Sequence, residues 1–274
     1  MFKELVKNIY KLDIPFDNVT TSSFLVVSEE GNILVDCGTY PDDVTSIILP
    51  ALNQIKIKPD YLFLTHSHGD HAGGTETLLK DFNDLKLICF NEDLCNKYGG
   101  RLLKDNDEII KNIRFLNLQG HSFDSGSLLD NRTNSLITGD CLQLFGIGKY
   151  GCGIGMPIEY VKSIRKLKGI LPNNIFASHE YYPLGSVAFG STEVNIYLEK
   201  CEQIYGKLVD FTMKAKDNGI SDTQKIAEEW EKLKRKSNPD MPFVPPHTFN
   251  AILSYKREDF ELLNVLFSYD SKED

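Results

Sequence analysis

The chain has 274 residues, of which 41% are hydrophobic and 25% are charged, and its formal net charge is −9. This composition is typical of a globular protein with a sizeable core, and the acidic balance gives no general electrostatic reason to bind nucleic acid or an anionic membrane. No stretch approaches the roughly 18 apolar residues of a membrane span, and residues 1–19 lack the apolar core of a signal peptide. We therefore expect a cytoplasmic protein with neither nucleic acid nor membrane as a partner. The six cysteines form no Cys-x-x-Cys pair, which predicts free thiols.

The first half of the chain alternates predicted strands with predicted helices. Two apolar runs, 23–27 and 32–36, flank the turn Ser-Glu-Glu-Gly and indicate an antiparallel hairpin. A helix is expected over residues 42–55, divided by Pro50. Residues 61–66 then predict a short buried strand. Further strands are expected at 85–90, 113–118, 126–130 and 134–140, and further helices at 74–82 and 92–98.

The second half begins with a glycine-rich loop at 146–155 and a helix opened by Pro157, followed by a strand at 173–178. After about residue 192 the pattern changes to charged amphipathic helices over 192–219 and 221–236, the second with Ser221 or Asp222 as its N-cap. A proline-rich linker at 238–247 and a helical tail follow. We expect a mixed α/β domain over 1–192, which carries the site, and a helical extension over 193–274.

A histidine cluster follows the strand at 61–66, in the segment Leu-Thr-His-Ser-His-Gly-Asp-His. His66 and His68 point the same way if the strand geometry continues, because alternate residues share a face. Asp70 and His71 then follow on the turn into the next helix. Imidazole nitrogens and carboxylate oxygens are ligands of zinc, so this segment alone could supply two metal ions.

Three more ligand-type residues occupy equivalent places at the ends of other predicted strands. His121 follows the strand at 113–118, Asp140 ends the strand at 134–140, and His179 ends the strand at 173–178. A lone histidine at a strand end is usually structural, but together these residues favour a metal centre at one edge of the sheets.

These motifs resemble those of the metallo-β-lactamase-fold hydrolase superfamily over about residues 8–185. The resemblance implies an αββα sandwich, two mixed sheets packed face to face with helices outside. It also implies a dinuclear site with two Zn²⁺ ions, although the same ligands accept iron or manganese. The family pattern would assign one metal to His66, His68 and His121, the other to Asp70, His71 and His179, and the bridging position to Asp140.

Two metal ions sharing a water would make a hydroxide available as a nucleophile, so the expected reaction is hydrolysis. Asp70 would ligate one metal, orient the nucleophile and carry its proton, which makes it the expected catalytic residue. The family's secreted zinc β-lactamases have a cysteine where this chain has Asp140, and its flavodiiron oxidoreductases have a glutamate where it has His68. The short separation of Asp140 and His179 leaves no room for the inserted domain of the nuclease branches.

The resemblance is closest to the glyoxalase II-like group, whose members cleave thioesters. The loop Gly-Lys-Tyr-Gly-Cys-Gly resembles a family loop in which a lysine holds the thiol part of the substrate, so Lys149 and Tyr150 would be substrate-binding residues. The other interpretation of this loop is a flexible glycine-rich surface segment. No copy of the family's glutathione-binding helices is recognisable.

The leading hypothesis is therefore a zinc-dependent hydrolase of a small-molecule acyl thioester. The alternatives are a lactonase, a phosphodiesterase or nuclease on the same metal core, and a non-catalytic binding module. A homodimer formed through the C-terminal helices is possible.

Two further residues have open roles. Asp36 resembles a buried family aspartate that accepts a proton from a ligand imidazole, but it could instead stabilise the turn after its strand. His247 could begin a C-terminal helix that covers the mouth of the site, or it could be a plain linker or cap residue.

Overall fold

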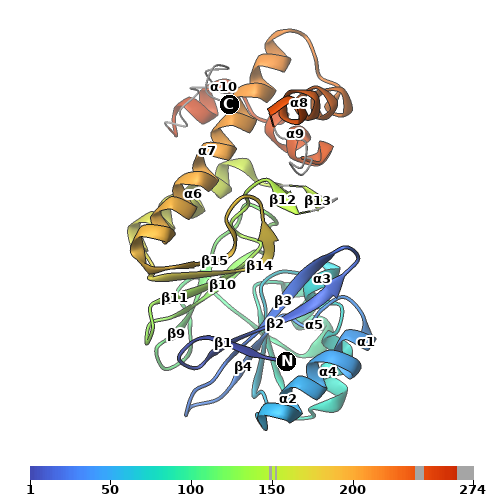
Figure 1. The fold of residues 1–274 in the computed structure, drawn as a ribbon, viewed down its shortest axis with the longest axis vertical. Coiled ribbons are helices and arrows are strands. Elements are labelled where there is room, and N and C mark those ends of the chain that lie inside the picture. The colour runs from blue at the N-terminus through green and yellow to red at the C-terminus, as the bar shows by residue number, and fades with distance from the viewer. Residues whose placement is uncertain (148–149, 152, 238–243, 264–274) are drawn as a thin grey trace. The chain divides into compact units, whose positions relative to one another are not determined.

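The computed structural model describes residues 1–147, 150–151, 153–237 and 244–263. The chain forms two compact units, which are described separately below (Figure 1). The first comprises Met1–Leu118, Asp124–Asp140 and Pro172–His179, and the second comprises Gln119–Phe123, Cys141–Leu171 and Glu180–Asp274. The division expected after residue 192 stays a prediction.

The first sheet of the first unit is seven-stranded, with the order β1-β2-β3-β4-β5-β6-β7. Neighbours from β1 to β4 are antiparallel, and those from β4 to β7 are parallel. The predicted hairpin is confirmed as β3 and β4, whereas β1 and β2 were not predicted. The strands are β1 (Lys3–Val6), β2 (Ile9–Phe16), β3 (Val19–Val26), β4 (Ile33–Val35), β5 (Tyr61–Leu64), β6 (Lys86–Cys89) and β7 (Arg101–Leu102).

Helices join the parallel strands, as parallel pairing requires. The helix expected over 42–55 is divided into α1 (Pro41–Asp43), a π-helical turn η1 (Val44–Ile48) and α2 (Leu49–Ile55). Pro50 lies in the first turn of α2, directly after the π-helical turn, so the change of helix type falls where a backbone N–H is missing. The other predicted helices of this region are confirmed as α4 (Thr75–Asp81) and α5 (Glu92–Tyr98), and a short α3 (Gly69–Ala72) precedes them.

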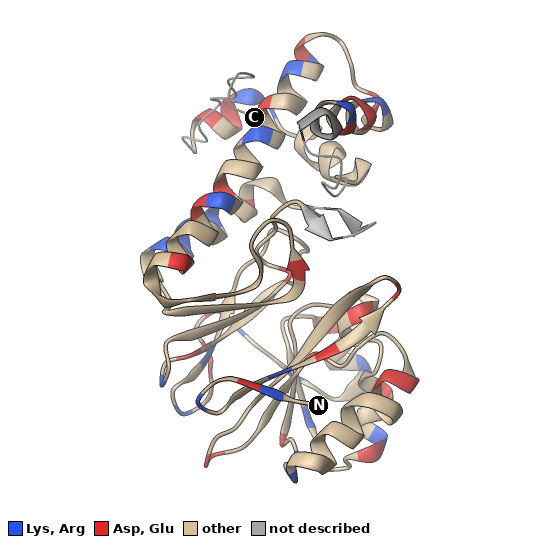
Figure 2. Ribbon diagram, viewed as in Figure 1, with Lys and Arg blue, Asp and Glu red and all other residues tan. Residues whose placement is uncertain are grey.

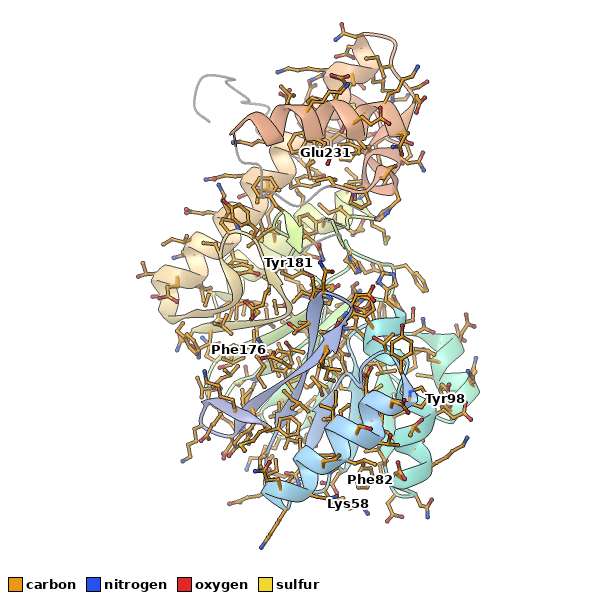
Figure 3. All side chains as sticks on the ribbon, turned by 45° about the vertical axis from the view of Figure 1, so that its right-hand side comes forward. Lys58, Phe82, Tyr98, Phe176, Tyr181 and Glu231 are labelled. Carbon is orange, nitrogen blue, oxygen red and sulfur yellow. The ribbon has the colours of Figure 1, made fainter. Side chains whose placement is uncertain are left out.

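The second sheet runs β14-β11-β10-β9-β8 within this unit. Its strands are β8 (Glu108–Ile110), β9 (Ile113–Asn117), β10 (Gly126–Asp130), β11 (Ser135–Gly139) and β14 (Asn174–Tyr181). It packs face to face on the first sheet, because the ring centroids of Phe24 and Phe176 lie 6.5 Å apart and those of Phe63 and Phe115 lie 6.1 Å apart. Phe176 lies in the interior of this unit (Figure 3).

The outer face of the first sheet is covered by helices. Leu25 and Leu62, the neighbours of Phe24 and Phe63 in sequence, belong to a buried cluster with Leu52 of α2 and Leu78 of α4. Successive residues of these strands therefore alternate between facing the second sheet and facing the helices. Because both faces are buried, the strands are apolar at consecutive positions. The layering agrees with the predicted sandwich.

The second unit is mainly helical. Its elements are β12 (Gly146–Ile147), β13 (Tyr150–Gly151), α6 (Pro157–Ile170), β15 (Gly185–Phe189), α7 (Gly190–Asp217), α8 (Thr223–Ser237), α9 (Pro246–Leu253) and α10 (Arg257–Glu261). Trp230 joins three of the helices, since its ring packs on Phe211 of α7 and on Phe249 of α9.

The charged helices α7 and α8 are present where the sequence pattern predicts them. Asp222 caps α8, because its Oδ1 accepts hydrogen bonds from the backbone N–H groups of Gln224 and Lys225. Acidic and basic residues are intermingled along α7 and α8 (Figure 2). Among the described residues, no helix combines the length and the apolar character needed to cross a membrane.

Candidate metal centre

The predicted histidine cluster lies directly after β5 in the first unit. His68 is the residue before α3, Asp70 lies in its first turn, and His71 in its last. The backbone of this turn is fixed from outside, because the N–H of Cys37 donates to the carbonyl of His71 at 2.8 Å. His66 and His71 are buried, at 2% and 0% exposed.

Asp70, His71 and His179 form one group of converging ligand atoms, all within 4.8 Å of one another. Oδ2 of Asp70 lies 3.4 Å from Nε2 of His71 and 3.2 Å from Nε2 of His179. His71 follows a strand of the first sheet and His179 lies on a strand of the second, so the two sheets meet at this edge. The set assigned to one metal by the sequence is thus brought together.

Asp140 joins His66 and His71 in a second group with the same spacing. Its Oδ1 lies 3.5 Å from Nε2 of His71, and its Oδ2 lies 3.4 Å from Nε2 of His179. Gly139 permits this approach: its φ is +55°, and a Cβ there would lie 2.5 Å from Cβ of Thr65. One carboxylate therefore lies beside two histidines of the set assigned to one metal, and its bridging of both metals stays a prediction.

Hydrogen bonds at Nδ1 orient the buried histidines. Nδ1 of His71 lies 2.8 Å from Oδ2 of Asp36, and Nδ1 of His179 lies 2.8 Å from the carbonyl of Thr20. A carboxylate and a carbonyl only accept, so Nδ1 carries the proton in both rings. In the neutral ring Nε2 is then left with the lone pair that a metal needs. The predicted contact of Asp36 with an imidazole is confirmed, and its orienting of a metal ligand stays a prediction.

Asp36 holds the whole turn as well as the histidine. It is fully buried, with φ at +59°, and it accepts the backbone N–H and the hydroxyl of Thr65, each at 2.8 Å. The Thr65 hydroxyl, having donated to Asp36, accepts from Nδ1 of His66 at 3.1 Å. His66 thereby also presents Nε2.

The electrostatics of the centre are those of a cation site. Burial opposes charge on His71 and His179, but nearby carboxylates outweigh it: Asp70, Asp140 and Asp36 raise the pKa of His71, and Asp140 and Asp70 raise the pKa of His179 to about 9. Burial likewise opposes charge on Asp70 and Asp140, yet the neighbouring histidines hold the pKa of both carboxyl groups well below the usual range. In the metal-free protein, protons on the histidines neutralise the negative charge of the carboxylates, and a bound divalent ion could neutralise this charge instead.

The residues present fit a metal by their chemistry and by their placement. Within the part of the chain that the structure describes, Nε2 of His71 is buried and makes no hydrogen bond. It lies 3.4 Å from a carboxylate oxygen of Asp70 and 3.5 Å from one of Asp140, as a nitrogen ligand lies beside the oxygen ligands of one ion. Nitrogen and oxygen donors without thiolate suit zinc, iron or manganese.

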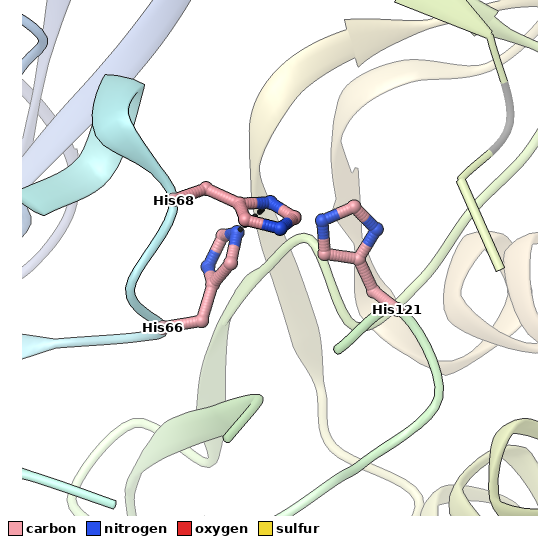
Figure 4. A group of neighbouring side chains, drawn as sticks. All are labelled: His66, His68 and His121. Carbon is pink, nitrogen blue, oxygen red and sulfur yellow. Dashed lines mark hydrogen bonds between the residues drawn. The ribbon is translucent and has the colours of Figure 1, made fainter. Parts of the chain in front are cut away.

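His66 and His68 face each other with Nε2 of His66 3.0 Å from Nδ1 of His68 (Figure 4). Since Nε2 of His66 keeps the lone pair, Nδ1 of His68 donates to it, and the binding of the other metal by these two residues stays a prediction. His121, also drawn in Figure 4, belongs to the second unit, where its Nδ1 donates to the carbonyl of Gly153 at 2.6 Å. It too presents Nε2, and its assignment beside His66 and His68 stays a prediction.

Comparison with known proteins supports the expected family. Residues 17–91 match the sequence profile of the metallo-beta-lactamase superfamily. A beta-lactamase-like protein 2 homolog of Drosophila melanogaster is 28% identical over 189 residues, covering 62% of each chain. A hydroxyacylglutathione hydrolase of Dictyostelium discoideum is 28% identical over 192 residues, covering 64% of this chain and 67% of the relative. The chain thus spans about three fifths to two thirds of the length of these relatives.

Among solved structures, the metallo-beta-lactamase FIM-1 from Pseudomonas aeruginosa, in its mono-zinc form, aligns with a TM-score of 0.58 at 14% identity, covering 75% of this chain and 96% of that one. The chain has the metallo-β-lactamase fold. The resemblance predicted from the motifs is therefore confirmed, and so is the fold class.

Within this metallo-β-lactamase fold, the predicted substrate residues are not tested. Lys149 lies outside the described residues, and for Tyr150 only the backbone, in β13, is described. Their role in substrate binding stays a prediction. His247 is the second residue of α9, so the helix that it was expected to begin is present.

Sequence reasoning missed Asp124 and Asn91, which hold the backbone of the turn at residues 66–68 in place. Asp124 is 1% exposed, and its Oδ2 accepts the backbone N–H of Ser67 at 3.0 Å and the side-chain amide of Asn91 at 2.7 Å. Ser67 stands between His66 and His68, so this bond fixes the backbone between two predicted ligands. The sequence feature that could have indicated Asp124 is its position three residues after His121 in the same motif.

Proposed function

We propose that this chain is a zinc-dependent hydrolase that uses two metal ions to cleave a small-molecule acyl thioester. The observation that carries the proposal is the convergence of Asp70, His71, Asp140 and His179 with their ligand atoms turned toward one another. The names of relatives such as hydroxyacylglutathione hydrolase support the thioester as the bond cleaved.

The proposed ligand sets are those that the family resemblance implies. His66, His68 and His121 would hold one ion, Asp70, His71 and His179 the other, and Asp140 would contribute to both. When bound, the two ions supply an activated water at neutral pH and polarise the carbonyl under attack.

Asp70 is the residue proposed to hold and move the proton. Its side chain is 16% exposed, against 8% for Asp140, 5% for His179 and 0% for His71. It is therefore the most accessible member of the group to solvent and substrate. The hydroxyl of Thr21 donates to its Oδ2 at 3.2 Å, which fixes the carboxylate while its other oxygen can accept a proton from water.

A thioester suits this site better than an ester or amide on chemical grounds. A thiolate leaves without being protonated near neutral pH, because the pKa of a thiol is about 8.5, so no dedicated general acid is required. A lactone remains the second candidate for the same carbonyl chemistry. A phosphodiester is less favoured because the net charge of −9 does not attract polyanions.

The test is elemental analysis of the purified protein combined with hydrolysis assays on acyl thioesters, lactones and bis-p-nitrophenyl phosphate. We expect about two metal ions per chain and preferential thioester turnover. Asp70→Ala and His68→Ala should abolish turnover and lower the metal content in a folded protein. Asp81→Ala, at an exposed position in α4, makes the same change away from the site and should have no effect. Full turnover by metal-stripped protein would refute the proposal.

A further inference from the structure

A hydrogen-bonded chain links His121 to the C-terminal helix α9 within the second unit. Nδ1 of His121 donates to the carbonyl of Gly153 at 2.6 Å. The N–H of Ile154 donates to Oγ1 of Thr248, on α9, at 3.1 Å. Ile154 and Thr248, which form the second hydrogen bond, are both 0% exposed.

The carbonyl of Gly153 and the N–H of Ile154 belong to one peptide group. A peptide group is planar, and its C=O and N–H point in opposite directions. Fixing the N–H against Thr248 therefore also fixes the direction of the carbonyl that receives the His121 proton. A peptide that donates through its N–H is also a better acceptor at its carbonyl, because hydrogen bonds in a chain polarise one another.

Gln143 holds the same loop from the other side. The N–H of Gly153 donates to Oε1 of Gln143 at 3.1 Å, and Nε2 of Gln143 donates to the hydroxyl of Tyr181 at 3.0 Å. Gln143 is 2% exposed. The two N–H groups that flank the Gly153 carbonyl are thus both engaged by buried side chains.

The space around Gly153 is matched to a residue without a side chain. A Cβ there would lie 3.1 Å from both Nδ1 and Cε1 of His121, and 3.6 Å from Nε2 of His247, which precedes Thr248 on α9. A side chain at position 153 would therefore require the imidazole to move by a few tenths of an ångström, which glycine avoids.

We infer that α9, through Thr248, is a positioning element that holds His121 in the tautomer able to bind a metal. Thr248 is a positioning residue because it acts through the Gly153–Ile154 peptide and not on the metal or the substrate. The helical extension then acts on one of the proposed metal ligands. The inference about the tautomer stands on the geometry of this unit alone, whereas its effect on metal binding rests on the proposed function.

The experiment compares the wild type with three variants of the full chain. Thr248→Val keeps the shape of the side chain but removes the acceptor, and Thr248→Ser keeps the acceptor. Thr212→Val is the matched control, because Thr212 is also 0% exposed but donates within α7 to the carbonyl of Leu208. Imidazole ¹⁵N NMR of the metal-free proteins, with His121 assigned through His121→Gln, reports the tautomer. Competition with a chelating dye reports zinc affinity, and thermal unfolding reports stability.

We expect the His121 proton on Nδ1 in the wild type and in Thr248→Ser, and a mixture of tautomers in Thr248→Val. Zinc affinity should fall about tenfold in Thr248→Val, the lower end of the range for residues behind a metal ligand. Thr212→Val should keep both the tautomer and the affinity of the wild type, even if its unfolding temperature falls.

Three results would overturn the inference. The first is a wild-type His121 protonated on Nε2, which requires no variant to fold. The second is an unchanged tautomer in Thr248→Val, and the third is a loss in Thr248→Ser equal to that in Thr248→Val. If the wild type binds no zinc, the proposed function fails, but the tautomer comparison still decides the positioning role.

Discussion

Replacing Asp36 with asparagine is expected to remove one metal ion from a protein that remains folded. The backbone N–H of Thr65 can only donate, so it holds the amide oxygen at the present place of Oδ1. The amide nitrogen then faces Nδ1 of His71, where Oδ2 now accepts at 2.8 Å. Two donors cannot bond, so His71 must move its proton to Nε2, and a protonated Nε2 cannot bind a metal.

The size of the effect follows from this single bond. Loss of the hydrogen-bond partner behind a metal-binding histidine lowers metal affinity about 10- to 100-fold, or about 1.4–2.8 kcal/mol at about 1.4 kcal/mol per tenfold. A hydrogen bond to a charged group contributes about 1.5–3 kcal/mol to the free energy of unfolding. That loss is smaller than the about 5–15 kcal/mol of a typical domain, so the variant should fold.

The assay is metal stoichiometry by elemental analysis, with zinc affinity measured by competition with a chelating dye. Asp36→Asn should retain about one of two ions, because Asp70, His71 and His179 serve one proposed site. The control is Asp43→Asn, since Asp43 is also buried and accepts two backbone N–H groups at 2.8 and 2.9 Å, but from Thr39 and Tyr40. Asp36→Asn with two ions bound at wild-type affinity would show that the tautomer argument is wrong.

Three further predictions concern other parts of the first unit. Asp124→Ala should lower the free energy of unfolding by about 2–4 kcal/mol, because it leaves the buried Asn91 amide and the part-buried Ser67 N–H unpaired. Asp124→Asn should restore most of the loss in urea unfolding, and equal losses would contradict this account. Zinc binding should release protons at pH 7.5, because carboxylates raise the pKa of His179 to about 9. The same pKa shift stabilises the metal-free protein fully below pH 6.5, and this stability is lost as the pH rises through 9. Calorimetry of zinc binding in buffers of different ionisation enthalpy should detect the proton release. A proton release that persists unchanged at pH 10 would contradict the prediction. Burial raises the pKa of the Cys37 and Cys89 thiols to about 12, so both should resist labelling by a disulfide reagent at pH 8 until the protein unfolds; rapid labelling of the native protein would count against this.

The central strands and the ligand turn were predictable because their signals are local. Residues 61–64 are apolar at every position, and a strand buried on both faces needs nothing else to be recognised. The ligand residues likewise followed such runs directly. Pro50 predicted the division of its helix because proline removes a backbone hydrogen bond within its own helical turn.

The edge strands and the supporting residues were not predictable because their signals are not local. β1 is the edge strand and β2 pairs with it. β2 contains Lys11, Asp13 and Pro15 among its apolar residues, a pattern that does not stand out from a loop. Asp124 accepts from Ser67, 57 positions away, and Thr248 accepts from Ile154, 94 positions away. Such hydrogen-bond partners are brought together only by the tertiary fold, so the sequence around a polar side chain does not indicate which distant N–H group it will accept.

His71 follows β5 of the first sheet and His179 lies on β14 of the second, so the candidate centre takes residues from both sheets. A cation held by both residues would act as a removable cross-link, formed only when the sheets are already stacked. Folding and metal uptake would then be thermodynamically linked, and an ion at a hundredfold excess over its dissociation constant would add about 2.7 kcal/mol to the stability of the sandwich. Metal starvation of the cell would therefore lower the amount of folded protein as well as its activity.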